Sequence, residues 1–99
     1  MNIKPGVDLT NISPQMQMAN AKAQLLWLAF GQQLVITSGR DGTHMSRSKH
    51  YEGNACDYRT RYFDDTTKAE VARTLAYILG DDYDVVVEST HIHVEYDPD

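Results

Sequence analysis

Cysteine is nearly absent from this chain of 99 residues: Cys56 stands alone, so no disulfide can form within the chain. Long apolar runs are also absent, and none approaches the roughly 20 residues that a transmembrane helix needs. The N-terminal sequence has no basic segment followed by an apolar one, so we expect no signal peptide. These absences predict a protein that is synthesised in the cytoplasm and does not enter a membrane.

Positive charge is scarce. Nine Lys and Arg residues face fourteen Asp and Glu residues, which gives a net charge of −5. Binding to phosphate backbones or anionic membranes needs clustered basic residues, so neither nucleic acid nor a membrane is an expected partner. A hydrophobic content of 41% is ordinary for a globular protein. The length suits a single domain over 1–99, monomeric, with an irregular lead-in over 1–12.

Two segments carry helix signals. Ser13 followed by Pro14 is typical of a helix start, apolar residues then recur at helical spacing, and Gly31 ends the pattern. A capping-box pattern that begins at Thr67 predicts the start of a second helix, which Gly80 ends.

Four short runs, 34–37, 55–59, 84–88 and 91–95, have the composition of strands. With the two helices they predict an α+β domain, in which a small antiparallel sheet of about four strands carries both helices on one face. The segment 38–53 is long for a loop in so small a domain and is rich in Gly, Ser, His and charge. Loops of this length are usually functional or disordered.

The last two predicted strands form a hairpin if Ser89-Thr90 is a tight turn. Glu88 then lies opposite His91, and both share one face with His93 and Glu95. The other face is shared by Val85, Val87, Ile92 and Val94. Histidines two residues apart on a strand project side by side, which is a common way to present ligands to one metal. The alternative is a pair of surface histidines without a ligand.

A turn that contains Gly53 separates His50 from Asp57 and can bring this imidazole beside the carboxylate. Two imidazoles, one carboxylate and an open position are typical of a catalytic zinc site. Glu88 is then available as the general base. Cys56 is a rival ligand because zinc favours thiolate, but strand alternation turns it away from Asp57 and towards the core.

These residues resemble a known family. Residues 48–57 read S-K-H-Y-E-G-N-A-C-D and match the S-x-H-x-x-G-x-A-x-D signature of the D-Ala-D-Ala carboxypeptidase, lysostaphin-like and hedgehog group of zinc peptidases. Residues 88–93, E-S-T-H-I-H, resemble the closing H-x-H of that group. The order of S-G-R-D-G at 38–42, His44 and these two motifs is most similar to hedgehog signalling domains.

The resemblance implies one zinc ion. In the signature motif the His and the Asp bind zinc, which assigns His50 and Asp57, and the second His of H-x-H assigns His93 as the third ligand. Glu88 would be the general base. His91 would stabilise the developing oxyanion or position water.

The resemblance also suggests three substrate-binding residues. Arg40 follows the strand where peptidase members often keep an Arg for the substrate carboxylate, and a planar guanidinium suits that task. A solvated loop charge is the alternative for Arg40. His44 would line the cleft or lie on the surface, and Ser48 would bond the loop backbone near the ligand His.

Two alternatives stay open at this point. Glu88 lies five residues before His93, one fewer than in hedgehog, so its reach depends on the turn. Some members of the group use an acid-x-x-His pattern, which Glu88 and His91 also fit, and His91 is then the third ligand.

The resemblance implies a zinc-dependent peptidase that hydrolyses a D-Ala-D-Ala or an L-Ala-D-Glu bond in peptidoglycan stem peptides. Delivery to the cell wall would follow a phage-type (endolysin-like) route, since no signal peptide is expected. The competing hypothesis is a non-catalytic, hedgehog-like binding module in which zinc ties loop and hairpin to a small core.

Overall fold

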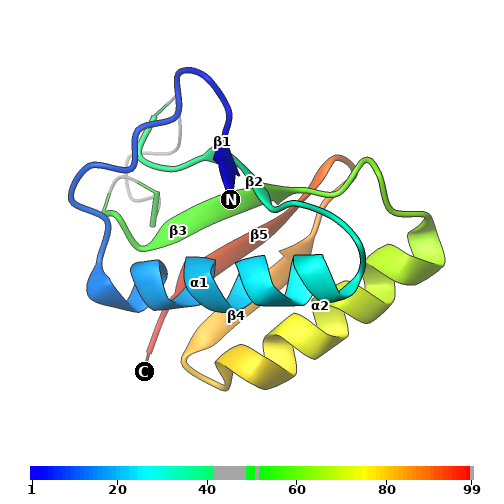
Figure 1. The fold of residues 1–99 in the computed structure, drawn as a ribbon. Coiled ribbons are helices and arrows are strands. Elements are labelled where there is room, and N and C mark those ends of the chain that lie inside the picture. The colour runs from blue at the N-terminus through cyan, green and yellow to red at the C-terminus, as the bar shows by residue number, and fades with distance from the viewer. Residues whose placement is uncertain (42–48, 51, 99) are drawn as a thin grey trace.

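The computed structural model describes residues 1–41, 49, 50 and 52–98. The chain forms two helices and five strands in an α+β arrangement (Figure 1). Their bounds, in chain order, are β1 (Asn2–Ile3), α1 (Pro14–Ala29), β2 (Val35–Ser38), β3 (Ala55–Arg59), α2 (Asp65–Leu79), β4 (Tyr83–Val87) and β5 (His91–Tyr96).

The strands form one mixed sheet in the order β1-β2-β3-β5-β4. β1 runs parallel to β2, and every other neighbouring pair is antiparallel. The prediction of about four antiparallel strands thus lacked β1, which lies in the segment expected to be irregular. Asn2 and Lys4 donate backbone hydrogen bonds to Leu34 and Ile36, and these bonds add the two-residue strand to the sheet edge.

Both helices cover the same face of the sheet, as predicted (Figure 1). α1 begins where expected, because the Ser13 hydroxyl accepts a hydrogen bond from the Met16 amide at 3.1 Å. The N-cap of α2 lies three residues before the predicted one at Thr67. The Asp64 side chain accepts from the Thr67 amide at 2.7 Å, so Asp64 is the N-cap and Thr67 lies in the first turn.

The hydrophobic core lies between the helices and the covered face of the sheet. Its large, fully buried members include Met16, Trp27, Leu34, Ile36, Tyr58, Val71, Leu75, Ile92 and Val94. Cys56 is also fully buried there, beside the Asn20 amide, and this burial raises the pKa of its thiol to about 11. The prediction that Cys56 faces the core is confirmed.

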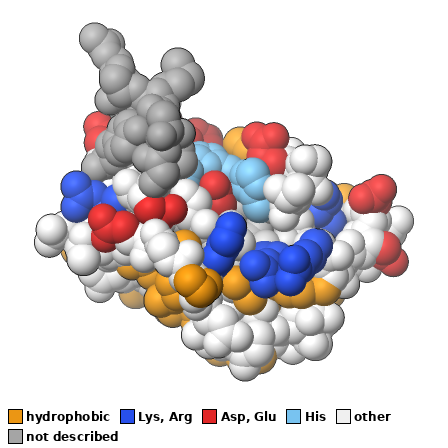
Figure 2. All heavy atoms as spheres, turned by 90° about the horizontal axis from the view of Figure 1, so that it is seen from above, with side chains coloured by type: hydrophobic (Ala, Val, Ile, Leu, Met, Phe, Trp, Pro, Cys, Tyr) orange, Lys and Arg blue, Asp and Glu red, His pale blue; other side chains and the backbone are white. Residues whose placement is uncertain are grey.

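Strand alternation sends every second side chain of β3 and β5 to the open face of the sheet, which neither helix covers. Tyr58, Ile92 and Val94 point into the core, so Asp57 and His93 point the other way. In Figure 2 the histidine side chains gather on one surface, with acidic and basic side chains beside them. Within the described ranges, no helix is long and apolar enough to cross a bilayer.

Candidate metal centre

Three predicted ligands meet on the open face. Asp57 in β3 and His93 in β5 are direct cross-strand partners, so their side chains leave the sheet next to each other. His50 comes from the loop before β3. The turn between His50 and β3 depends on Gly53, which has a positive φ of 75° and lies so close to Asn11 that an added Cβ would be 2.7 Å from the Asn11 oxygen.

The ligand atoms converge on one carboxylate oxygen. His93 Nδ1 lies 2.9 Å from Asp57 Oδ1, and His50 Nε2 lies 3.3 Å from the same oxygen. All three residues offer ligand atoms within 4.8 Å of one another. In a tetrahedral zinc site with bonds of about 2.0–2.1 Å, neighbouring ligand atoms are about 3.3 Å apart. The spacing around Asp57 is therefore close to that of a metal site.

Each imidazole is held from its far side. His50 Nδ1 lies 2.8 Å from the Gly39 carbonyl oxygen, which can only accept, so this nitrogen carries a hydrogen. His93 Nε2 donates in the same way to Glu95 Oε1 at 2.8 Å. Outer hydrogen bonds of this kind fix the tautomer and orientation of metal-ligating histidines.

The donor set fits a cation. His50 carries a hydrogen on Nδ1, so its Nε2 has a lone pair for a metal ion or for a second proton. Nε2 lies 3.3 Å from Asp57 Oδ1, which is an acceptor, so a proton or a metal cation must lie between the two atoms. Two imidazole nitrogens and one carboxylate oxygen are donors that zinc accepts, and three protein ligands leave a fourth position for substrate or water.

The charges in the metal-free centre affect one another. Burial acts to raise the pKa of Asp57, but hydrogen bonds from His50 and His93 and the positive charge of His50 and His91 outweigh it, so this pKa lies well below its usual range. The hydrogen bond to Asp57 raises the pKa of His93 against the opposing effect of burial, and Glu95 adds to the rise. Asp57 is thus ionised at neutral pH, as a metal ligand must be.

His91 lies at the rim of this centre. Its Nε2 is 3.7 Å from Asp57 Oδ2, and its Nδ1 is 3.0 Å from the Thr90 hydroxyl. Its side chain is 29% exposed, against 19% for His93 and 5% for His50. The geometry therefore favours His93 over His91 as the third ligand.

Glu88 directly follows β4, and its backbone amide donates to the His91 carbonyl at 2.9 Å, as the predicted hairpin requires. Lys68 Nζ donates to its carbonyl oxygen at 3.1 Å. The residue is exposed, and within the described ranges its carboxylate makes no hydrogen bond or ion pair. Its role as general base stays a prediction.

The predicted substrate-binding residues are only partly described. Arg40 Nη1 donates to the Thr10 carbonyl at 3.2 Å, and its amide donates to the Asp8 carbonyl at 2.7 Å, so Arg40 is attached to the N-terminal segment. His44 and Ser48 lie outside the described residues.

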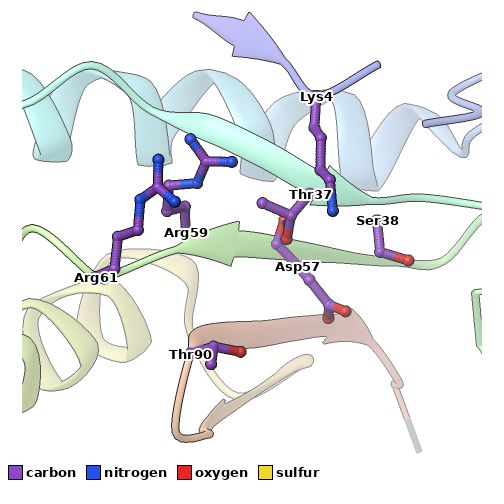
Figure 3. Close-up of a pocket in the computed structure, with 7 residues that line it drawn as sticks. All are labelled: Lys4, Thr37, Ser38, Asp57, Arg59, Arg61 and Thr90. Carbon is purple, nitrogen blue, oxygen red and sulfur yellow. Dashed lines mark hydrogen bonds between the residues drawn. The ribbon is translucent and has the colours of Figure 1, made fainter. Parts of the chain in front are cut away.

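Sequence reasoning missed two features of the site. The first is the role of Glu95, which alternation placed on the correct face without a function. The second is a cavity of about 320 Å³ that adjoins Asp57 (Figure 3). It is lined by Lys4, Thr37, Ser38, Asp57, Arg59, Arg61 and Thr90. Lys4 is far from Arg59 and Arg61 in the sequence, so no local pattern links the three basic residues.

The site thus combines three convergent ligands, a fixed orientation for each imidazole, and an adjoining cavity with basic walls. All of these lie on the open face of the sheet. Comparison with protein-family models and with curated proteins finds no match for this chain.

Proposed function

We propose that this protein is a zinc-dependent hydrolase that cuts an amide bond in a peptide. The observation that supports the proposal most strongly is the convergence of His50 Nε2 and His93 Nδ1 on a single oxygen of Asp57. Zinc, when bound, supplies a Lewis acid that polarises the scissile carbonyl and lowers the pKa of water towards about 7.

A catalytic site suits these residues better than a structural one. A structural zinc site closes its tetrahedron with four protein ligands, commonly with cysteines. Here the described part of the chain offers three ligands, and Cys56 is turned into the core. The Asp57 side chain keeps 13% of its surface exposed and borders the cavity, so a substrate can reach this side of the centre.

The residues around the ligands have distinct tasks. When the Thr90 hydroxyl donates to His91 Nδ1, the ring hydrogen is on Nε2, the nitrogen that faces Asp57. His91 can then donate a hydrogen bond to the oxygen on which negative charge develops. Glu88, next to His91 across the hairpin, is the proposed base that removes a proton from the attacking water.

The proposed substrate is a peptidoglycan stem peptide, cut at a D-Ala-D-Ala or an L-Ala-D-Glu bond. This part of the proposal is supported by the resemblance of the motifs at 48–57 and 88–93 to the zinc peptidases named above. Delivery to the wall by a phage-type route belongs to the same proposal.

A second candidate is a zinc-stabilised binding module without turnover. It is favoured by one observation, the exposed carboxylate of Glu88, which makes no bond to the three ligands among the described residues. In such a module zinc would stabilise the fold by tying the loop at His50 to the hairpin at His93.

Metal analysis combined with a release assay on purified peptidoglycan separates these candidates. Wild-type protein should contain about one zinc per chain and release amines or D-alanine. Glu88→Gln should keep the metal and lose release, whereas Glu70→Gln, an equal change on the exposed side of α2, should keep both. Stoichiometric zinc without release from several wall types would establish the binding module instead.

A further inference from the structure

The cavity beside Asp57 has basic walls. Lys4, Arg59 and Arg61 line it together with hydroxyl-bearing residues, and Asp57 is the one acidic residue among them. Figure 3 shows the two guanidinium groups beside each other and the Lys4 ammonium group between Thr37 and Ser38, with the Asp57 carboxylate between the strands. The cavity therefore joins the metal centre through Asp57.

The sheet itself positions these cations. Arg59 lies two residues after Asp57 on β3, so both side chains leave the same face, and Arg59 is the cross-strand partner of His91. Lys4 follows β1 and donates its amide to the Ile36 carbonyl at 3.0 Å, which places it beside Thr37 of β2. Arg61 lies two residues beyond the end of β3.

The charges of this cavity are unusual for the chain. The protein carries a net charge of −5 and has nine Lys and Arg residues in all, yet three of the nine line this one cavity. In the described part of the chain no carboxylate forms an ion pair with Lys4, Arg59 or Arg61. Like charges gathered without partners repel each other, so their placement calls for an anionic ligand.

Asp57 does not supply that negative charge. Its Oδ1 is shared by His50 and His93, and its Oδ2 faces His91 at 3.7 Å. The cavity volume of about 320 Å³ is at the lower end of the range of about 300–1,000 Å³ that is typical of small-ligand sites. A ligand of one or two amino-acid residues suits this size.

We propose that the cavity binds a free carboxylate group of the peptide substrate, next to the bond that is cut. Two guanidinium groups offer the forked donors that pair with a carboxylate in two parallel hydrogen bonds, and Lys4 adds a third positive charge. This inference rests on the proposed hydrolase function. It favours a carboxypeptidase, which acts on a peptide with a free C-terminus, over cleavage in the middle of a chain.

The proposal differs from the expectation drawn from the sequence, which assigned the substrate carboxylate to Arg40. The Arg40 side chain donates to the Thr10 carbonyl, and Arg40 does not line the cavity. Arg59 and Arg61 lie on the Asp57 side of the site.

The test is calorimetric titration of the full chain with N-acetyl-D-Ala-D-Ala and with the same dipeptide as its C-terminal amide, on zinc-loaded and on metal-free protein. The free acid should bind at least about tenfold more tightly than the amide in both forms, since a charged hydrogen-bond pair is lost in the amide. Arg59→Gln combined with Arg61→Gln should remove the difference, and Arg61→Gln alone should reduce it without a risk to the fold because Arg61 is exposed. Arg73→Gln, on the exposed side of α2, should leave it unchanged.

Equal affinity for acid and amide would overturn the proposal, as would an unchanged difference in the double variant. Inorganic phosphate serves as a third titrant: if it binds in the metal-free protein while the free acid does not, the cavity takes phosphate groups and the carboxylate assignment is wrong. Binding to metal-free protein does not depend on hydrolysis. Preference for the free acid without any peptide release would therefore contradict the hydrolase and leave the carboxylate site standing. Equal hydrolysis of acid and amide would contradict the carboxylate site and leave the hydrolase standing.

Discussion

Glu95 offers the sharpest single perturbation of the proposed metal centre. Its Oε1 accepts the hydrogen bond from His93 Nε2 at 2.8 Å, on the side of the ring away from Asp57. This bond leaves Nδ1 as the ligand atom and holds the ring towards the centre. We expect Glu95→Ala to weaken zinc binding without removing any ligand.

The magnitude follows from measured losses of such outer partners, which are typically 10–100-fold in metal affinity, or about 1.4–2.8 kcal/mol. The Glu95 side chain is 22% exposed, so water can replace part of the lost bond. We therefore expect roughly a tenfold loss for Glu95→Ala. Glu95→Gln should lose less, because its side-chain oxygen can still accept from His93.

Competition between the protein and a chromophoric chelator measures the zinc dissociation constant of each variant. Asp84→Asn is the matched control. Asp84 is the cross-strand partner of Glu95, so this substitution removes one negative charge from the same region. It should bind zinc as the wild type does. An equal loss in Asp84→Asn would show that net charge alone sets the affinity, and an unchanged affinity in Glu95→Ala would refute the role of the outer bond.

Further predictions rest on individual contacts of His93, Gly53 and Asp64. The raised pKa of His93 means that its ion pair stabilises the metal-free protein below about pH 6.5 and is lost as the pH rises through the raised value, so urea midpoints should fall over that interval. Zinc must displace the proton from His93, so zinc affinity should rise over the same pH interval in which the stability of the metal-free protein falls. Gly53→Ala should destabilise the fold by roughly 1–3 kcal/mol in chemical denaturation, because φ is positive and the Asn11 oxygen blocks a Cβ; a neutral substitution would contradict the described turn. Asp64→Ala should cost about 1 kcal/mol and lower Tm by several degrees, since the bond to the Thr67 amide caps α2, whereas an unchanged Tm would remove Asp64 as the cap.

Much of the fold was readable from local patterns. The Ser13-Pro14 start and the four β-rich runs predicted α1 and the strands β2 to β5, because each signal lies within the element that it specifies. β1 was missed because a strand of two residues is too short to show a hydrophobic period. Its hydrogen bonds to β2 are made by the backbone, so its side chains carry no signal of the pairing. The cap of α2 was misplaced because both Asp64 and Thr67 are good cap residues, and the structure selects Asp64.

The candidate site divides in the same way. Alternation within one strand was enough to send Asp57 away from the core and to group His91 with His93. The pairing of β3 with β5, which brings Asp57 and His93 to 2.9 Å, joins strands that are separated by α2 and β4. The basic cavity was invisible for the same reason, because Lys4 and Arg59 meet only when β1, β2 and β3 are assembled into one sheet.

X-ray absorption spectroscopy of the protein after addition of one equivalent of zinc tests the central claim most directly. The account predicts stoichiometric binding with a first shell of nitrogen and oxygen atoms at about 2.0–2.2 Å, including the scattering pattern of two imidazoles. His50→Ala should lower that imidazole contribution and weaken binding. A sulfur shell at about 2.3 Å, which would require Cys56 to leave the core, or the absence of bound zinc, would contradict the assignment of His50, Asp57 and His93.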